Sequence, residues 1–155
     1  IKHRYKVLRE VIDESSQKVL IFVPFRHAIA ILTEKLRKDG ITTEVIQGDV
    51  SASQRTQIFK TFQQTSDPRV LVIQPQAAAH GVTLTAANTV VWWGPTSSLE
   101  TYAQANARVH RSGQKHKCTV VQLHGSPVEK RVYALLDNRI DVHTKMIELY
   151  EELLD

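Results

Sequence analysis

The chain has 155 residues, of which 42% are hydrophobic and 23% charged, a balance typical of a globular domain with its own apolar core. The formal net charge of +4 permits a nucleic-acid partner without requiring one, and no apolar run approaches the roughly 20 residues needed to span a membrane. The only cysteine, Cys118, excludes an internal disulfide, and its apolar neighbours predict a buried, unreactive thiol in a reducing compartment. The chain starts at Ile1 and not at a methionine, which indicates a fragment of a longer protein.

Five short apolar runs predict β-strands, and several consist almost entirely of Val, Ile and Leu, as strands buried on both faces do. These runs are residues 18–24, 42–47, 69–74, 89–93 and 117–124. Helical segments alternate with them. Apolar residues recur at helical spacing in residues 3–15 and 26–39, and Gly40 ends the second segment.

Further helices are predicted from the residues that would cap them. Ser51 and Gln54 have the spacing of a capping box that opens a helix over residues 53–64. Ser97 and Glu100 have the same spacing ahead of the next helix.

The last predicted helix starts at Ser126, Pro127 and Glu129, which combine an N-cap, a first-turn proline and a capping glutamate. We expect it to run over about residues 127–154, packed on the rest of the domain, with residues 137–138 as a candidate break.

Strands that alternate with helices predict an α/β fold: a doubly wound, mainly parallel sheet with helices on both faces. No linker, repeat or low-complexity stretch divides the chain, so residues 1–155 are expected to form one domain. In such a sheet the ligand site is expected at the carboxyl ends of the strands.

The most informative stretch is residues 104–114, Q-A-N-A-R-V-H-R-S-G-Q, at the end of a predicted helix. Arg108 and Arg111 are three residues apart, so on a helix they share one face and can present two guanidinium groups to one target. The planar guanidinium matches phosphate oxygens, which is what phosphoryl transfer requires of an arginine finger. The alternative is a solvated basic helix end that meets the helix dipole.

Two other stretches have a phosphate-binding interpretation beside a structural one. The small residues of 74–88 allow a ligand or another backbone to approach closely, or they form a tight turn that packs onto the sheet. Ser51 and Arg55 lie at a helix N-terminus, which attracts phosphate, or else they serve capping and packing. Trp92 and Trp93 are expected to pack in the core, with stacking on a base as the alternative.

These blocks, taken together, resemble the motifs of the second motor domain of Swi/Snf-type superfamily-two helicases. Residues 104–114 match motif VI of that family, Q-A-x-x-R-x-H-R-x-G-Q, and residues 77–88 resemble motif V, A-G-G-x-G-L-N-L-T-A-A-D. Residues 19–25 resemble motif IV, and residues 48–62 resemble the block that follows it. In motif V the matching residues are Gly81, Leu84, Thr85, Ala86 and Ala87, while Ala78, Ala79, Thr83 and Asn88 depart from the pattern.

The resemblance implies a RecA-like fold and a role for each matching residue. Arg108 and Arg111 would be the catalytic arginine fingers, with His110 orienting Arg111 by a hydrogen bond. The nucleotide cleft would also include Gly81, Gln104 and Gln114, the two glutamines steadying the motif. Contacts to the DNA backbone would come from Ser51, Arg55 and Thr83.

The chain has no G-x-x-x-x-G-K-[ST] phosphate loop, no D-E-x-H strand and no zinc-ligand spacing. The resemblance therefore implies that an N-terminal RecA-like lobe of the same polypeptide holds ATP and Mg²⁺, and that this fragment alone binds no cofactor and is inactive. The implied partner is double-stranded DNA, bound without sequence preference, and no membrane partner is implied. The run A-A-N-T-V-V-W-W-G-P-T resembles bacterial or phage members, which implies the cytoplasm; a eukaryotic source would imply the nucleus.

Two alternatives to a motor lobe remain open at this point. The first is a non-catalytic nucleic-acid-binding or interaction module that retains the helicase fold. The second is a self-contained nucleotide-binding enzyme, which the missing phosphate loop disfavours.

Overall fold

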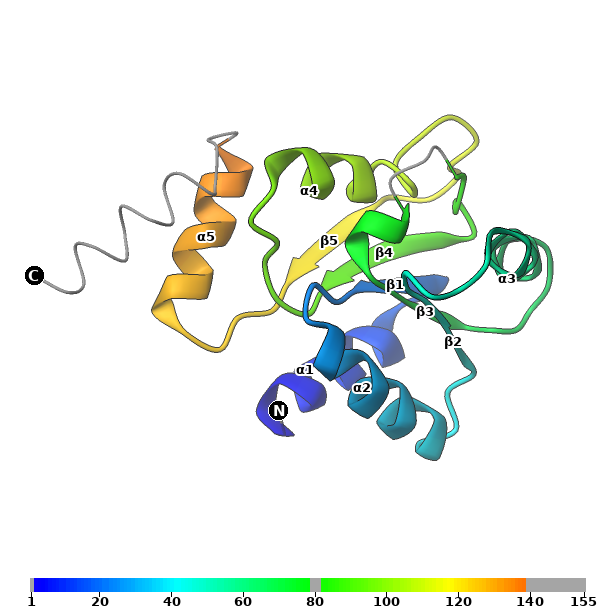
Figure 1. Ribbon diagram of the computed structural model, residues 1–155, viewed down its shortest axis with the longest axis horizontal. Helices are drawn as coiled ribbons and strands as arrows, with labels where there is room; N and C mark the ends of the chain where they lie inside the picture. The colour runs from blue at the N-terminus through cyan, green and yellow to red at the C-terminus, as the bar shows by residue number, and fades with distance from the viewer. Residues whose placement is uncertain (1, 79–81, 139–155) are drawn as a thin grey trace, which may run out of the picture.

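The computed structural model describes residues 2–78 and 82–138. Along these residues, strands and helices alternate, with a short 3-10 helix, η1, after the third strand (Figure 1). The elements are α1 (Lys2–Glu14), β1 (Lys18–Phe22), α2 (Arg26–Lys38), β2 (Thr43–Ile46), α3 (Ala52–Gln64), β3 (Val70–Ile73), η1 (Pro75–Ala78), β4 (Ala87–Trp92), α4 (Leu99–Asn106), β5 (Thr119–Gln122) and α5 (Pro127–Asp137). No helix in these two ranges is long and apolar enough to cross a lipid bilayer.

All five strands lie in one sheet with the order β2-β3-β1-β4-β5. Every neighbouring pair is parallel, which confirms the predicted doubly wound sheet. The chain leaves β3 and crosses β1 to reach β4, so the connection between these two strands passes over the middle of the sheet. Parallel neighbours require such crossover connections, and the helices supply them.

Helices cover both faces of the sheet, and each face has its own apolar core. One core joins the sheet to α1 and α2 through residues such as Leu8, Ile12 and Leu32. The other joins it to α3, α4 and α5 through residues such as Phe62 and Tyr133. Strands β1 and β3 are buried on both faces because they lie between these two layers, which explains their almost unbroken Val, Ile and Leu sequence.

The positions of the strands in the sheet explain how deeply the two tryptophans and the cysteine are buried. Trp92 is fully buried and Trp93 is 4% exposed, so both pack in the core as predicted. Cys118 is only half-buried, which corrects the prediction of a buried thiol. It directly precedes β5, an edge strand that has a partner on one side only and whose first residues are exposed.

The helix starts confirm one capping prediction and correct another. Ser51 caps α3 in a complete capping box, because its hydroxyl accepts from the Gln54 backbone N–H while the Gln54 side chain accepts from the Ser51 N–H. Helix α4 is capped by Ser98 and not by Ser97. The Ser98 hydroxyl accepts from Thr101 N, so the helix begins one residue later than the Ser97 spacing predicts.

Helix α5 starts as predicted, with Ser126 as its N-cap and proline in its first turn. The Glu129 carboxylate accepts from Gly125 N at 2.7 Å and forms an ion pair of 2.8 Å with Arg4 of α1. Arg4 also donates to the Trp93 carbonyl, so it joins α1 to the exit of β4. The described part of α5 ends at Asp137; the remainder of the predicted helix over 127–154 lies outside the described residues.

Candidate functional site

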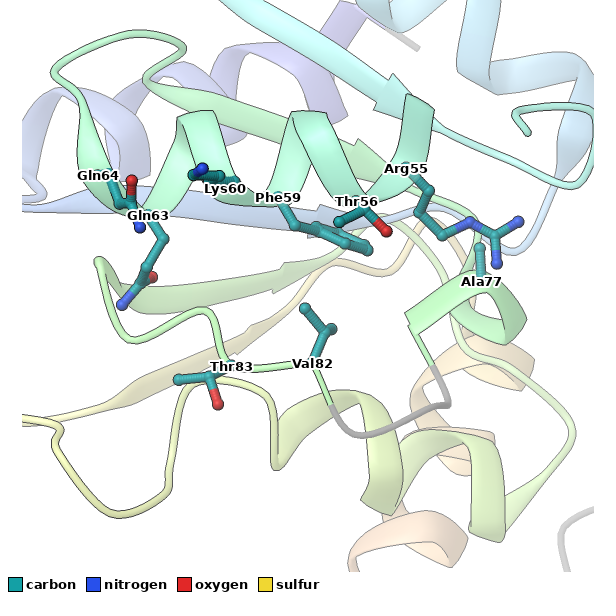
Figure 2. Close-up of a pocket in the computed structure, with 9 residues that line it drawn as sticks. All are labelled: Arg55, Thr56, Phe59, Lys60, Gln63, Gln64, Ala77, Val82 and Thr83. Atoms are coloured by element: carbon teal, nitrogen blue, oxygen red, sulfur yellow. The ribbon is translucent and has the colours of Figure 1, made fainter. Parts of the chain in front are cut away.

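Residues 82–86, the connecting segment, lead into β4 and lie between α3 and the turn that follows α4. The segment has no helix or strand structure, yet its backbone is held from both sides. Leu84 N donates to the Arg108 carbonyl at 2.9 Å, and Ala86 N donates to the Gln63 side chain at 2.9 Å. Figure 2 shows the Val82 side chain of this segment pointing toward α3. The predicted motif V and motif VI residues are therefore adjacent in space.

The two arginines converge on one atom of this segment. Arg111 Nη1 donates to the Val82 carbonyl at 3.1 Å, and Arg108 Nη1 lies 3.5 Å from the same oxygen. They do not meet on a helix face, because α4 ends at Asn106 and both arginines follow it in turns. The two guanidinium groups lie close together for a different reason from the predicted helical spacing, and their action on a phosphate stays a prediction.

Arg108 differs from Arg111 in its surroundings. Arg108 is 9% exposed, and its Nε donates to the Gln104 carbonyl at 2.9 Å. Burial, and then the charge of Arg111, lower the pKa of the Arg108 guanidinium. An arginine remains charged at neutral pH despite such a shift. Arg111 is exposed, whereas Arg108 is buried and belongs to the packing of the domain.

The glutamines expected to steady motif VI make different contacts. Gln114 Nε2 donates to the carbonyls of Ala87 and Val109, both at 2.9 Å, which ties the turn to the first residue of β4. Gln104 acts through its backbone carbonyl, and its side chain donates to Glu100 on the exposed side of α4. Because Ala87 is at the amino end of β4, the turn lies away from the carboxyl ends of the strands, where the ligand site was expected.

His110 directly precedes Arg111 in the chain. Within the described part of the chain, no hydrogen bond joins the two side chains, and the imidazole is exposed. Both residues line an open pocket of about 630 Å³ that contains no carboxylate among its lining residues. These residues are His110, Arg111, Gln114, His116, Lys117 and Cys118.

A second pocket, of about 390 Å³, lies between α3 and the connecting segment. Figure 2 shows that one wall comes from successive turns of α3 and the opposite wall from Ala77, Val82 and Thr83. It brings together Arg55 and Thr83, two of the three residues predicted to contact DNA. The third, Ser51, is exposed at the N-cap of the same helix, one turn before Arg55.

Arg55 has donor capacity that the domain does not use. Its Nη2 lies 3.4 Å from the Val50 carbonyl, a long contact, and its Nε is buried with no hydrogen-bond partner among the described residues. In Figure 2 its guanidinium extends from the first turn of α3 toward Ala77. A cation in that position, next to a helix N-terminus, can bind phosphate oxygens.

Sequence reasoning missed Gln63, at the last turn of α3. Its Nε2 donates to Thr85 Oγ1 at 2.8 Å, and its Oε1 accepts from Ala86 N. No spacing rule relates a helix residue to a partner 22 positions later, so no sequence signal identified this contact. Gly81, which was expected to line the nucleotide cleft, lies outside the described residues.

Comparison with known proteins identifies the family of this chain. The model of the helicase conserved C-terminal domain matches residues 3–113. The chain therefore belongs to the helicase C-terminal domain family, with helicases of the Swi/Snf type among its relatives.

Two relatives and one solved structure illustrate the similarity. An ATP-dependent helicase of Schizosaccharomyces pombe is 30% identical over 141 residues, which are 90% of this chain and 14% of the relative. The DNA annealing helicase and endonuclease ZRANB3 of Homo sapiens is 32% identical over 121 residues, 76% of this chain and 11% of the relative. The C-terminal part of the Fun30 ATPase domain has the same RecA-like fold, with a TM-score of 0.79 and 22% identity over 86% of this chain and 45% of that one. The chain thus spans about one-seventh or less of these two relatives' length.

Proposed function

We propose that this domain is the C-terminal motor lobe of an ATP-dependent DNA translocase, and that it acts with an N-terminal RecA-like lobe of the same polypeptide. In this function, Arg111 and Arg108 stabilise the charge that develops on the phosphates during hydrolysis. The convergence of both guanidinium groups on the Val82 carbonyl is the observation that carries the proposal. The Val82 carbonyl oxygen lies within reach of both guanidinium groups. A phosphate oxygen could bind the two guanidinium groups in place of this carbonyl oxygen.

The chemistry of the donors fits ATP phosphates and leaves Mg²⁺ to the other lobe. Among the described residues, the pocket beside Arg111 is lined by cationic, amide, imidazole and thiol groups and by no carboxylate. Such groups bind phosphate oxygens, whereas Mg²⁺ is held by carboxylates and phosphates. Mg²⁺, when bound with ATP, would neutralise phosphate charge. This chain would supply the arginines, and Gln114 would hold their turn against β4.

DNA would contact the N-terminal end of α3 and the connecting segment. Arg55 and Thr83 line the same pocket, and Ser51 lies one helical turn from Arg55. The proposed contacts go to the phosphate backbone, so binding would be independent of sequence. The relatives include an ATP-dependent helicase and a DNA annealing helicase, which supports both ATP and DNA as substrates.

The proposal is tested by the dependence of ATP hydrolysis on the second lobe. Residues 1–155 alone are expected to give no DNA-stimulated ATP hydrolysis, because the chain lacks the phosphate-loop lysine and magnesium ligands. The full-length protein is expected to hydrolyse ATP faster with duplex DNA than without it. Phosphate release, measured for both proteins at equal concentration, checks this expectation. Robust turnover by residues 1–155 would favour a self-contained enzyme, and an inactive full-length protein that still bound DNA would favour a non-catalytic module.

Replacing Arg55 by alanine is expected to weaken duplex binding about tenfold for all sequences alike, because one charged phosphate contact is lost. The slope of log affinity against log salt should fall by about one. Fluorescence anisotropy with two unrelated duplexes over a salt series measures both quantities. Arg131→Ala, which removes an exposed arginine on α5, is the matched control and should leave the affinity unchanged. An unchanged salt slope in Arg55→Ala would refute the backbone contact.

A further inference from the structure

The Gln63 side chain uses both ends of its amide on the connecting segment. One end donates to the Thr85 hydroxyl, and the other accepts from the Ala86 backbone N–H. This pair of bonds joins the last turn of α3 to the residues immediately before β4. An amide with a donor and an acceptor fixes both the position and the orientation of a backbone segment.

The opposite side of the same segment is bonded to the two arginines. Leu84 N donates to the Arg108 carbonyl, and the Val82 carbonyl accepts from Arg111. Val82 and Leu84 are thus bonded on the arginine side, and the next two residues, Thr85 and Ala86, are bonded on the α3 side. A shift of α3 relative to the sheet would therefore move the carbonyl that positions the arginines.

The end of α3 that carries Gln63 is also bonded to the sheet. Lys18, the first residue of β1, donates from Nζ to the carbonyls of Phe62 and Thr65. These bonds hold the C-terminal turn of the helix to the central strand. Gln63 therefore extends from a turn that is held in place by hydrogen bonds. Because this turn is ordered, Gln63 can transmit a rotation of α3 to the connecting segment.

We propose that Gln63 is a positioning residue that couples DNA contact by α3 to ATP hydrolysis at Arg111, through the connecting segment. The inference rests on the proposed function, in which the N-terminal end of α3 contacts the DNA backbone. Gln63 touches neither the nucleotide nor DNA in this scheme. DNA that engages Arg55 sets the position of α3, and Gln63 transmits that position to Thr85 and Ala86.

The test uses the full-length protein and compares Gln63→Met with Gln64→Met. Methionine keeps the length of the side chain and removes both hydrogen bonds. Gln64 is the matched control, because it is exposed, is the next residue of the helix and lines the same pocket. Gln63→Met is expected to lower the turnover number at saturating duplex DNA about 3- to 10-fold, with the DNA-free rate unchanged. Gln64→Met should match the wild type in both rates.

Two further variants separate coupling from simple structural support. Thr85→Val removes one partner of Gln63, so combining it with Gln63→Met should cost less than the sum of the two separate effects. Gln63→Glu keeps an acceptor for Ala86 N and can accept from the Thr85 hydroxyl, so it should retain most of the DNA-stimulated turnover. Thermal unfolding of each variant identifies any that are unfolded at the assay temperature.

Three outcomes would overturn the role of Gln63: unchanged stimulation in Gln63→Met, an equal fall in the DNA-free and stimulated rates, or a change only in the DNA concentration for half-maximal rate. Arg111→Ala is measured in the same series. Wild-type turnover in Arg111→Ala would overturn the arginine role itself. Lost turnover there, together with normal stimulation in Gln63→Met, would overturn the coupling role alone.

Discussion

Replacing Arg111 by alanine in the full-length protein is expected to lower the ATP turnover number about 10³- to 10⁵-fold, the usual effect of losing an arginine finger. The fixed charge stabilises the transition state, in which negative charge spreads over the transferred phosphoryl group. Because Arg111 is exposed and follows α4 in a turn, its loss should change the melting temperature little. Steady-state phosphate release, nucleotide affinity and thermal unfolding measure the three quantities.

Arg111→Lys provides a sharper comparison than alanine alone. Lysine keeps the positive charge but lacks the planar pair of donors, so it should restore only a small part of the turnover. Arg131→Ala on α5 is again the control for loss of an exposed arginine. Turnover near the wild-type value in Arg111→Ala would exclude an arginine finger at this position, and a large fall in melting temperature would assign the residue a structural role.

Replacing Arg108 by alanine is expected to lower both turnover and the free energy of unfolding, the latter by about 1–3 kcal/mol. Its side chain is buried and donates to the Gln104 carbonyl, so truncation leaves that acceptor without its partner and removes a packed aliphatic stem. Urea denaturation of residues 1–155 measures the stability, and phosphate release by the full-length protein measures the turnover.

Arg108→Met separates the two contributions. Methionine preserves most of the apolar stem and removes the donors, so it should recover part of the stability without recovering turnover. A variant that recovered both would show that the guanidinium is dispensable. Wild-type stability in Arg108→Ala would contradict the packing role, whatever its turnover.

The fold was largely predictable because its signals are local. The strands that lie between two helix layers are almost purely aliphatic, and Ser51 and Gln54 form a capping box whose geometry follows from their spacing. Alternation of these elements predicts a parallel sheet for general reasons. The start of α4 was placed at Ser97 instead of Ser98 because adjacent serines offer two equivalent caps and only the folded backbone selects one.

The residues of the candidate site stay predictions, and little of their geometry follows from the sequence. The motif identified Arg108 and Arg111, yet their approach to Val82 depends on turns after α4 that no helical periodicity describes. The different burial of the two arginines depends on packing against distant parts of the chain. The bonds of Gln63 likewise join residues that only the crossover from β3 to β4 brings together.

The connecting segment has one further consequence, which concerns local unfolding. Its Leu84 and Ala86 amides are bonded to opposite neighbours, and the Ala87 amide is bonded to the Leu84 carbonyl within the chain itself. A stretch without helix or strand would ordinarily fray residue by residue. Here Val82, Leu84, Thr85 and Ala86 cannot open without breaking a bond to α3 or to the arginine turn. The connecting segment, the last turn of α3 and the turn after α4 should therefore unfold and re-form as one cooperative unit.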